Sequence, residues 1–421
     1  MFTSDLLNKI SGGEFDEVLK DIYGDVLLAR ERYLKVINGF KELYGERDVM
    51  IFSAPGRSEI GGNHTDHQHG KVLACAIDLD IVCVVSFTDD NKVSLTSEGF
   101  GVSEVDLADL DPRDDEAGKS SAIIRGISKA FVDRGMKISG FRAYMVSSVL
   151  GGSGLSSSAA FESLIGTIYS KGLNDGRIND IEIAKIGQYA ENIYFKKPCG
   201  LMDQMACSCG GCVDIDFADE PVVERIDFDL SKYGYTLCVV DTRGSHEHLT
   251  PEYAAIPNEM KMVARYFGKE YLNEIDENDF YSSIGELRKL ENDRALLRAH
   301  HFLSENKRVP MMAEKLREGD IEAFFAIVKE SGSSSYRYLQ NVYASSEPHN
   351  QEVSLALALI ERFLDGRGAY RVHGGGFAGT VQAYVPKDEV ENFTELMESV
   401  FGKQCVYALN VRKQGGTLVI G

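Results

Sequence analysis

The chain has 421 residues, of which 43% are hydrophobic and 26% charged, and its formal net charge is −20. This length exceeds the roughly 250–300 residues at which a single core stops growing, so we expect two domains. The negative charge disfavours a surface for nucleic acid or for an anionic membrane. No apolar run approaches the ~20 residues that span a bilayer, and the N-terminus lacks the features of a signal peptide. We therefore expect a cytoplasmic protein in which Cys75, Cys83, Cys238 and Cys405 are reduced thiols.

Hydrophobic spacing predicts the elements in chain order. Residues 1–48 have a helical pattern. Residues 72–87 predict two strands on either side of Asp78-Leu79-Asp80, and 141–149 predict a strand that leads into a helix starting at Ala159. Further helices are expected over 181–195, 256–266, 280–303, 311–329, 353–364 and 389–401, and strands over 235–240, 380–385 and 406–411. Strands mixed with helices, without regular βαβ alternation, predict an α+β fold.

A glycine- and serine-rich stretch occupies residues 151–160, Gly-Gly-Ser-Gly-Leu-Ser-Ser-Ser-Ala-Ala. Glycines let backbone N–H groups approach an anion, and a helix N-terminus favours negative charge. The stretch is neither a Walker A sequence nor the glycine loop of protein kinases. It predicts a phosphate-binding loop, although taken alone an ordinary turn with a serine cap would be the better interpretation.

Three further segments accompany this loop: 54–66, 200–204 (Gly-Leu-Met-Asp-Gln) and 374–379 (Gly-Gly-Gly-Phe-Ala-Gly). In this order the four segments resemble those of the GHMP small-molecule kinases. The first resembles the signature of the galactokinase subgroup, Gly-Arg-Val-Asn-Leu-Ile-Gly-Glu-His-Thr-Asp. Residues 56–66 align with that signature without a gap and match it at Gly56, Arg57, Gly62, His64, Thr65 and Asp66.

The resemblance runs from about residue 36 to the C-terminus and implies the two-domain GHMP kinase fold. Residues 33–220 would form an N-terminal domain of the left-handed βαβ type that binds sugar and ATP. Residues 221–421 would form a ferredoxin-like C-terminal domain, with the active site in the cleft between the two. Residues 1–32 precede the resemblance and are expected to be an added helical extension.

Phosphoryl transfer requires positioned reactants, neutralised charge and an acceptor for a proton. Asp203 is the candidate base, and Arg57 is the candidate cation that stabilises charge or keeps Asp203 ionised. Alone, Asp203 could equally cap a helix and Arg57 could lie on the surface, but the accompanying motifs favour catalysis. The resemblance implies Mg²⁺ on Ser158 and Glu191, and ATP on Gly152, Ser153, Gly154, Leu155, Ser156, Ser157 and Ser158.

The resemblance places the sugar on Asn63, His64, Thr65, Asp66, Gly200 and Tyr253. Here the chain departs from the signature, which has glutamate where this chain has Asn63, and Val-Asn-Leu-Ile where it has Ser58-Glu59-Ile60-Gly61. In the family pattern that glutamate accepts hydrogen bonds from sugar hydroxyls, including the one at C6. Asparagine is shorter and neutral, and it donates as well as accepts. We expect phosphorylation at the anomeric hydroxyl, of galactose first or of a related hexosamine, uronic acid or deoxy sugar.

Two other functions compete with this prediction. A metal-dependent hydrolase could use side chains at ligand-like spacing, namely His64, Asp66, His67 and His69, with His246 and His248. That hypothesis leaves the glycine loops and the Met-Asp-Gln motif without a purpose. A GHMP-fold regulator could bind sugar and ATP without turnover, but Asp203, Arg57 and Glu191 together argue for an intact active site. The cysteine spacing between residues 199 and 212 fits no standard metal site.

Overall fold

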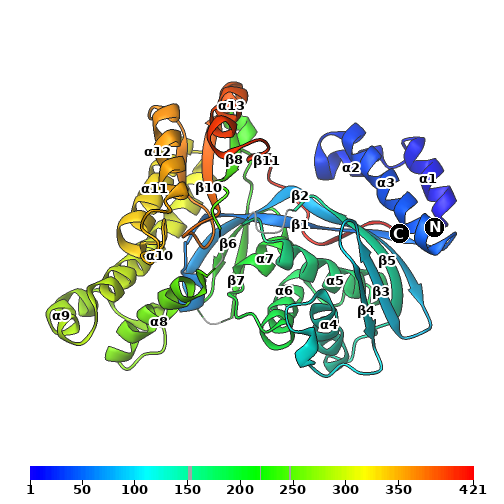
Figure 1. Ribbon diagram of the computed structural model, residues 1–421, viewed down its shortest axis with the longest axis horizontal. Helices are drawn as coiled ribbons and strands as arrows, with labels where there is room; N and C mark the ends of the chain where they lie inside the picture. The colour runs from blue at the N-terminus through cyan, green and yellow to red at the C-terminus, as the bar shows by residue number, and fades with distance from the viewer. Residues whose placement is uncertain (150–153, 219, 246–247) are drawn as a thin grey trace.

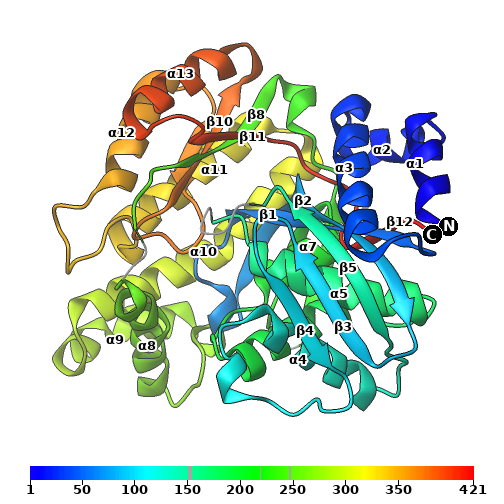
Figure 2. The ribbon, with the colours of Figure 1, turned by 45° about the vertical axis from the view of Figure 1, so that its right-hand side comes forward.

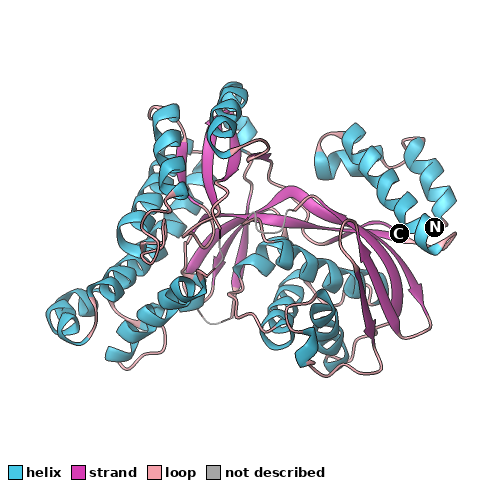
Figure 3. Ribbon diagram, viewed as in Figure 1, coloured by secondary structure: helices cyan, strands magenta, loops and turns pink. Residues whose placement is uncertain are grey.

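A computed structural model describes residues 1–149, 154–218, 220–245 and 248–421. The chain forms two β-sheets with helices packed on both (Figure 1), and Figure 3 shows how strands and helices alternate irregularly along it. The expected α+β fold is therefore confirmed. Among the described helices, none combines the length and apolar character that a bilayer span requires.

The larger sheet has the order β12-β1-β2-β5-β3-β4, and β6 joins β2 on one side and β7 on the other. Only β3 and β5 are paired in parallel among the described strands. The strands of this sheet are β1 (Met50–Gly61), β2 (Lys71–Thr88), β3 (Lys92–Ser97), β4 (Val102–Asp106), β5 (Gly140–Ser147), β6 (Cys212–Asp216), β7 (Val222–Ile226) and β12 (Thr417–Ile420).

Helices cover both faces of this sheet (Figure 2). One face carries α4 (Ser120–Asp133), α5 (Ser157–Leu173), α6 (Asp180–Tyr189) and α7 (Met202–Cys209), and the other carries α1 (Thr3–Ser11), α2 (Asp16–Tyr23) and α3 (Val26–Tyr44). Tyr33, Phe40 and Val84 are fully buried between α3 and the sheet. The N-terminal helices therefore share a core with the sheet, and the predicted division at residue 32 falls inside α3.

The smaller sheet has the order β11-β8-β10-β9 and is antiparallel throughout. Its strands are β8 (Tyr235–Asp241), β9 (Ala369–Val372), β10 (Thr380–Pro386) and β11 (Val406–Leu409). Counted along the chain, this is the order 4-1-3-2, with helices after the first and third strands, as the ferredoxin-like expectation requires. The helices that accompany it are α8 (Thr250–Tyr266), α9 (Glu277–Leu290), α10 (Asp293–Glu318), α11 (Ile321–Ser334), α12 (Glu352–Leu364) and α13 (Val390–Phe401).

The two sheets divide the chain between β7 and β8, and β12 then returns to the larger sheet. The division predicted at residue 220 precedes β7 and stays a prediction. Seven of the described strands were not expected from the sequence, because most are short and β1 runs through a glycine-containing motif: β1, β3, β4, β6, β7, β9 and β12.

One expected break is absent. The two strands predicted around Asp78-Leu79-Asp80 are a single strand, β2, so this prediction was wrong. Asp80 is fully buried, yet its carboxylate accepts hydrogen bonds from Arg412 Nη1 (2.7 Å) and Tyr23 Oη (2.7 Å). Asp78 in turn accepts from Asn410 Nδ2 at 2.7 Å. Partners supplied by distant segments thus remove the cost of placing two carboxylates in a strand.

The helices predicted over 280–303 and 311–329 are divided differently. The chain forms three helices, α9, α10 and α11, and α10 continues through Pro310. The breaks fall where side chains can cap the next helix: Asn292 Oδ1 accepts from Ala295 N (2.8 Å), and Asp320 Oδ1 accepts from Ala323 N (3.1 Å). Before Asp320, Gly319 adopts a φ of +74° and ends α10.

Candidate active site

Arg57 and Asp203 form an ion pair although 146 residues separate them. Arg57 lies on β1, and Asp203 lies in the first turn of α7. The guanidinium donates from Nε to Oδ1 at 2.7 Å and from Nη2 to Oδ2 at 2.8 Å, which is the two-point geometry that arginine favours with carboxylates. Burial alone would raise the pKa of Asp203, but Arg57 and a hydrogen bond from Ser156 outweigh it and lower that pKa. Asp203 is therefore held as a carboxylate.

The glycine-serine loop packs directly on this pair. Arg57 donates from Nη1 to Gly154 O at 2.5 Å and from its backbone N–H to Leu155 O at 3.1 Å. Gly56 permits this approach, since a Cβ there would lie 2.7 Å from Leu155 O. Ser156 donates its hydroxyl to Asp203 and does not cap α5 with its side chain, so the N–H groups of the first turn of α5 face the loop uncapped by that residue.

A free helix N-terminus beside a loop of this kind is a site for phosphate. Ser157 and Ser158 are half-buried in the first turn of α5. Two of the residues predicted to bind ATP, Gly152 and Ser153, lie outside the described residues. The structure thus brings Gly154, Leu155 and Ser156 to the Arg57–Asp203 pair.

The predicted metal ligand Glu191 lies in the single turn of π-helix that extends α6, Ala190–Phe195, and is 2% exposed. Gln204 Nε2 donates to Glu191 Oε2 and to Glu162 Oε2, both at 3.0 Å. Glu162 follows Ser158 by one helical turn on α5 and so shares its face. Burial and the charge of Glu191 raise the pKa of Glu162 well above its usual value.

This oxygen-rich group fits a small hard cation. Glu162 Oε1 and Gln204 Oε1 are buried and have no hydrogen-bond partner among the described residues. Mg²⁺ prefers oxygen ligands and retains several waters, so a hydroxyl and a carboxylate suffice to hold it. Glu162 was not predicted as a member of this group; its position one turn after Ser158 was the available signal.

Two of the predicted sugar-binding residues, Asp66 and Gly200, are neighbours close to Asp203. Asp66 accepts from the backbone of His67 at 2.9 Å, and Gly200 passes so close that a Cβ there would lie 1.7 Å from Asp66 Oδ2. Burial, followed by the charge of Asp203, raises the pKa of Asp66. Thr65 is fully buried and donates to Lys71 O at 2.6 Å, so its hydroxyl holds its own loop. Asp66 and Gly200 are therefore neighbours, as the resemblance implied.

The carbonyl groups of the Gly374–Gly376 loop are occupied by side chains from this region. Asn63 Nδ2 donates to Gly374 O (2.7 Å), His64 Nε2 donates to Gly375 O (3.0 Å), and Tyr253 Oη donates to Gly376 O (2.7 Å). Three residues that the sequence assigned to the sugar thus contact the glycine motif of residues 374–379. The contacts join the end of β1 and α8 to the β9–β10 connection.

Asn63 is fully buried, and protein groups satisfy its side chain. Besides Gly374 O, its Nδ2 donates to Glu59 Oε1 at 3.1 Å. Its Oδ1 accepts from Asn341 Nδ2 at 2.8 Å and from Ser335 Oγ at 3.2 Å. The residues around it, Glu59, Ser335 and Asn341, were missed in the sequence; the glutamate at the signature's asparagine position was the one visible sign.

The histidines of the rival metal hypothesis point to different partners. His64 contacts Gly375 O, His67 Nδ1 lies 3.3 Å from Gln68 Nε2, and His69 stacks on Tyr271 with ring centres 3.8 Å apart. Burial lowers the pKa of His64 to about 4 and that of His67 to about 3. Within the described ranges, no group of three or more His, Cys, Asp or Glu is placed to hold a metal ion. His246 lies outside them, and the hydrolase hypothesis gains no support.

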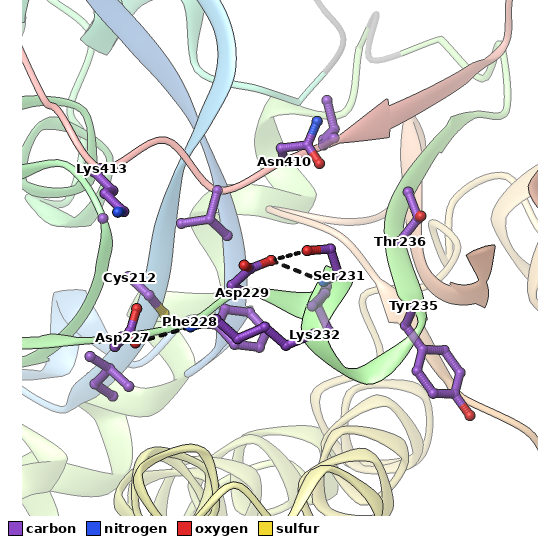
Figure 4. A pocket seen from close by; sticks show the side chains of 15 residues that line it. Cys212, Asp227, Phe228, Asp229, Ser231, Lys232, Tyr235, Thr236, Asn410 and Lys413 are labelled. Atoms are coloured by element: carbon purple, nitrogen blue, oxygen red, sulfur yellow. Dashed lines mark hydrogen bonds and ion pairs between the residues drawn. The ribbon is translucent and has the colours of Figure 1, made fainter. Parts of the chain in front are cut away.

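A cavity of about 350 Å³ lies apart from these residues, where β6, β7, β8 and β11 approach one another (Figure 4). Asp229 accepts from Ser231 N and Oγ beside it, and Lys232 pairs with Asp227 at 3.2 Å. None of the residues predicted to bind sugar, ATP or metal lines this cavity. Its acidic side chains are engaged locally, and we assign it no part in the chemistry.

Comparison with known proteins covers most of the chain. Residues 38–87 match the family model described as the galactokinase galactose-binding signature, and residues 122–211 match the GHMP kinases N-terminal domain. A galactokinase from Streptomyces coelicolor is 32% identical over 371 residues, which cover 86% of this chain and 91% of that one. A galactokinase from Actinobacillus pleuropneumoniae serotype 5b is 30% identical over 375 residues, covering 87% and 92%.

Among solved structures, Lactococcus lactis galactokinase complexed with galactose superposes with a TM-score of 0.78 at 22% identity, covering 90% of this chain and 98% of that one. A mevalonate kinase superposes with a TM-score of 0.61. The fold and the ordered glycine motifs define a GHMP kinase. Within that class, the chain belongs to the galactokinase family.

Proposed function

We propose that this protein transfers the γ-phosphoryl group of ATP to the anomeric hydroxyl of a free sugar, with galactose as the first choice. The observation that carries the proposal is the two-point Arg57–Asp203 ion pair, which contacts Gly154, Leu155 and Ser156 of the serine loop and lies near Asp66, the neighbour of Gly200. Residues proposed to bind phosphate and residues proposed to bind sugar thus meet at this pair. The galactokinase relatives, about 30% identical over most of the chain, support the same assignment.

In the reaction, the sugar's anomeric oxygen forms a bond to the γ-phosphorus while the bond from that phosphorus to ADP breaks. Asp203 accepts the hydrogen bond of the attacking hydroxyl and finally its proton. A carboxylate of lowered pKa is a weak base, which suits a loose transition state in which the proton leaves late. Arg57 keeps Asp203 ionised and offers positive charge to the transferred group.

ATP would lie on the loop of residues 152–158, with its phosphates at the N-terminus of α5. Ser158 and Glu191 would hold Mg²⁺, which neutralises charge on the phosphates when bound. Glu162 and Gln204, which share hydrogen bonds around Glu191, would set the position of that carboxylate. A cytoplasmic location belongs to this proposal, and the eight free cysteines fit a reducing compartment.

A related sugar is the second candidate, and the neutral side chain at residue 63 favours it. Asn63 replaces the glutamate of the family signature and is fully engaged with protein groups. The related sugars in question are a hexosamine, a uronic acid and a deoxy sugar. Both candidates use the same residues for phosphoryl transfer.

The test is a panel of free sugars with Mg·ATP and pure protein, with ADP release as the readout. Phosphorus NMR of the product then distinguishes a 1-phosphate from an ester at another hydroxyl. We expect galactose to be turned over and the product to be the 1-phosphate. If no hexose, hexosamine, uronic acid or deoxy sugar drives ADP release, the chain is not a sugar kinase and the regulator hypothesis takes its place.

A further inference from the structure

The departure from the signature at residues 59 and 63 is an exchange. Where the signature has asparagine, this chain has Glu59, and where the signature has glutamate, it has Asn63. The two side chains contact each other, because Asn63 Nδ2 donates to Glu59 Oε1 at 3.1 Å. In either arrangement one of the two positions has an amide and the other a carboxylate. The exchange reverses which position can donate a hydrogen bond.

The exchange moves the negative charge away from the end of β1 and toward the C-terminal domain. Glu59 Oε1 accepts from Arg371 Nη2 on β9 at 2.7 Å. The two side chains are 4% and 0% exposed, so this is a buried ion pair. The remaining donors of Arg371 are also used: Nη1 donates to Ile60 O at 2.8 Å, and Nε donates to Val372 O at 3.1 Å. The charge of Glu59 is therefore compensated inside the protein.

The groups around residue 63 suit both the nitrogen and the oxygen of a side-chain amide. The nitrogen faces two acceptors, Glu59 and Gly374 O, and the oxygen faces two donors, Asn341 and Ser335. A carboxylate at this position would face Glu59 and Gly374 O with no hydrogen to donate. With Glu59 present, residue 63 therefore has to be a group that both donates and accepts.

We infer that Glu59 and Asn63 act as one exchanged pair that determines sugar specificity, by holding the family's carboxylate against Arg371 and leaving this end of the sugar site without free negative charge. The inference rests on the proposed function. It implies that the site discriminates weakly at C6, so that sugars of galactose configuration altered there, such as 6-deoxygalactose, are accepted along with galactose. A site that binds a hydroxyl through a dedicated buried acceptor rejects an analogue lacking it by about 10⁴ or more, so the contrast is measurable.

The pairing is tested first by stability, using Glu59→Asn, Asn63→Glu and the double exchange in the full chain. Glu59→Asn leaves Arg371 buried without its carboxylate, and Asn63→Glu places two carboxylates side by side. Each is expected to lower the melting temperature by about 6–20 °C. The double exchange restores one amide and one carboxylate. Its melting temperature should therefore lie well above the value expected from adding the two single losses. Glu395→Asn, an exposed carboxylate on α13, is the matched control and should leave the melting temperature unchanged.

Should Asn63→Glu not fold, Glu59→Gln and Asn63→Asp complete the same cycle with side-chain lengths retained. Additive melting temperatures in either cycle would overturn the pair. This readout needs no substrate, so it stands even if the proposed function fails. Failure of the proposed function would appear separately, as absence of turnover in the unchanged protein.

Specificity is tested next by kcat/KM for galactose and 6-deoxygalactose. In the unchanged protein, kcat/KM for the two sugars should differ by no more than about tenfold, because a single uncharged hydrogen bond contributes no more than that. The double exchange should prefer galactose by at least tenfold more, mainly through a higher KM for the deoxy sugar. Asn63→Glu alone is no substitute, since it disturbs the pair. An unchanged ratio in a well-folded double exchange would show that the pair supports the fold and does not select the sugar.

Discussion

The two ends of the site are built in opposite ways. At the proposed phosphate end, Arg57, Asp203 and Ser156 contact one another, and Gly154 and Leu155 of the loop accept hydrogen bonds from Arg57. At the sugar end, protein groups hold Asn63 on every side, and the carbonyls of Gly374–Gly376 accept hydrogen bonds from three side chains. A few charged groups thus form the proposed phosphate end, whereas a packed hydrogen-bond network forms the proposed sugar end.

The difference teaches where reaction and specificity reside. The groups proposed for phosphoryl transfer lie in the motifs that resemble those of the family, so the reaction type was predicted from residues that motifs identify. Specificity depends on which donors and acceptors remain unused after the network has formed. Glu59, Arg371 and Asn341 decide which donors and acceptors remain unused, and none of the three was predicted as a site residue.

The largest effect is expected at the phosphate end, from Asp203→Asn. The variant should lose about 10²–10⁴ in kcat, or more, because an acceptor for the proton and the charge opposite Arg57 are removed together. ATP binding, measured by calorimetry, should change little. Asp227→Asn, an exposed aspartate paired with Lys232, is the control and should retain full activity. Near-normal kcat in Asp203→Asn would remove this residue from the chemistry.

Arg57→Ala should lower kcat by about 10²–10³, the range seen when one preorganised donor to developing charge is lost. The fall in kcat should exceed the rise in KM for ATP, since the guanidinium is proposed to act on the transition state. Arg57→Lys retains the positive charge without the two-point geometry. Its kcat should lie between those of the unchanged protein and Arg57→Ala. A variant in which only KM changes would reassign Arg57 to ground-state binding.

At the sugar end, Gly200→Ala should raise the KM for sugar at least about tenfold. A Cβ at this position would lie 1.7 Å from Asp66 Oδ2, so the loop or the aspartate has to move. Gly285→Ala, on α9 with open space around it, is the matched control and should behave as the unchanged protein. Unaltered sugar kinetics in Gly200→Ala would separate the Asp66–Gly200 contact from sugar binding.

The pH dependence sharpens the same comparison. The pKa of Asp203 is lowered, so its carboxylate persists as the pH falls, and its own protonation should add no acid limb to kcat above about pH 4. In Arg57→Ala the burial of Asp203 loses the strongest influence that opposes it, so the pKa of Asp203 should rise and its acid limb should appear at higher pH. Circular dichroism at each pH separates this shift from unfolding. Superimposable profiles for the two proteins would contradict the role of Arg57 as the partner that keeps Asp203 ionised.

The smallest effect is expected from Tyr253→Phe, which removes one hydrogen bond to Gly376 O and keeps the ring. A neutral hydrogen bond contributes about 0.5–1.5 kcal/mol, so kcat/KM should fall by roughly two- to tenfold. Tyr281→Phe, on α9 and half-exposed, serves as the control. A loss as large as that of Arg57→Ala would mean that the glycine loop, and with it the sugar end, takes part in the transition state.

Much of the fold was predictable from local sequence, and so was the choice of Arg57, the serine loop and Asp203, which the structure brings together. The strand over residues 141–149, the helix that follows the serines, and the helical pattern of residues 1–48 were all confirmed, because hydrophobic period and glycine content act over a few residues. The errors have the opposite origin. Asp78 and Asp80 suggested a turn, and a continuous strand formed because Arg412 and Asn410, more than 330 residues away, supply their partners.

The sequence by itself determined the family and singled out Arg57, the serine loop and Asp203 as the groups proposed for phosphoryl transfer, since they stand in motifs whose residue types that chemistry requires. Only the tertiary structure decided how Asn63 is used. Whether an amide contacts a sugar or the protein depends on every donor and acceptor around it, and here those come from β1, the turn after α11 and the β9–β10 connection. Hydrogen-bond satisfaction of a buried group is a property of the assembled fold, so no local pattern in the chain could reveal it.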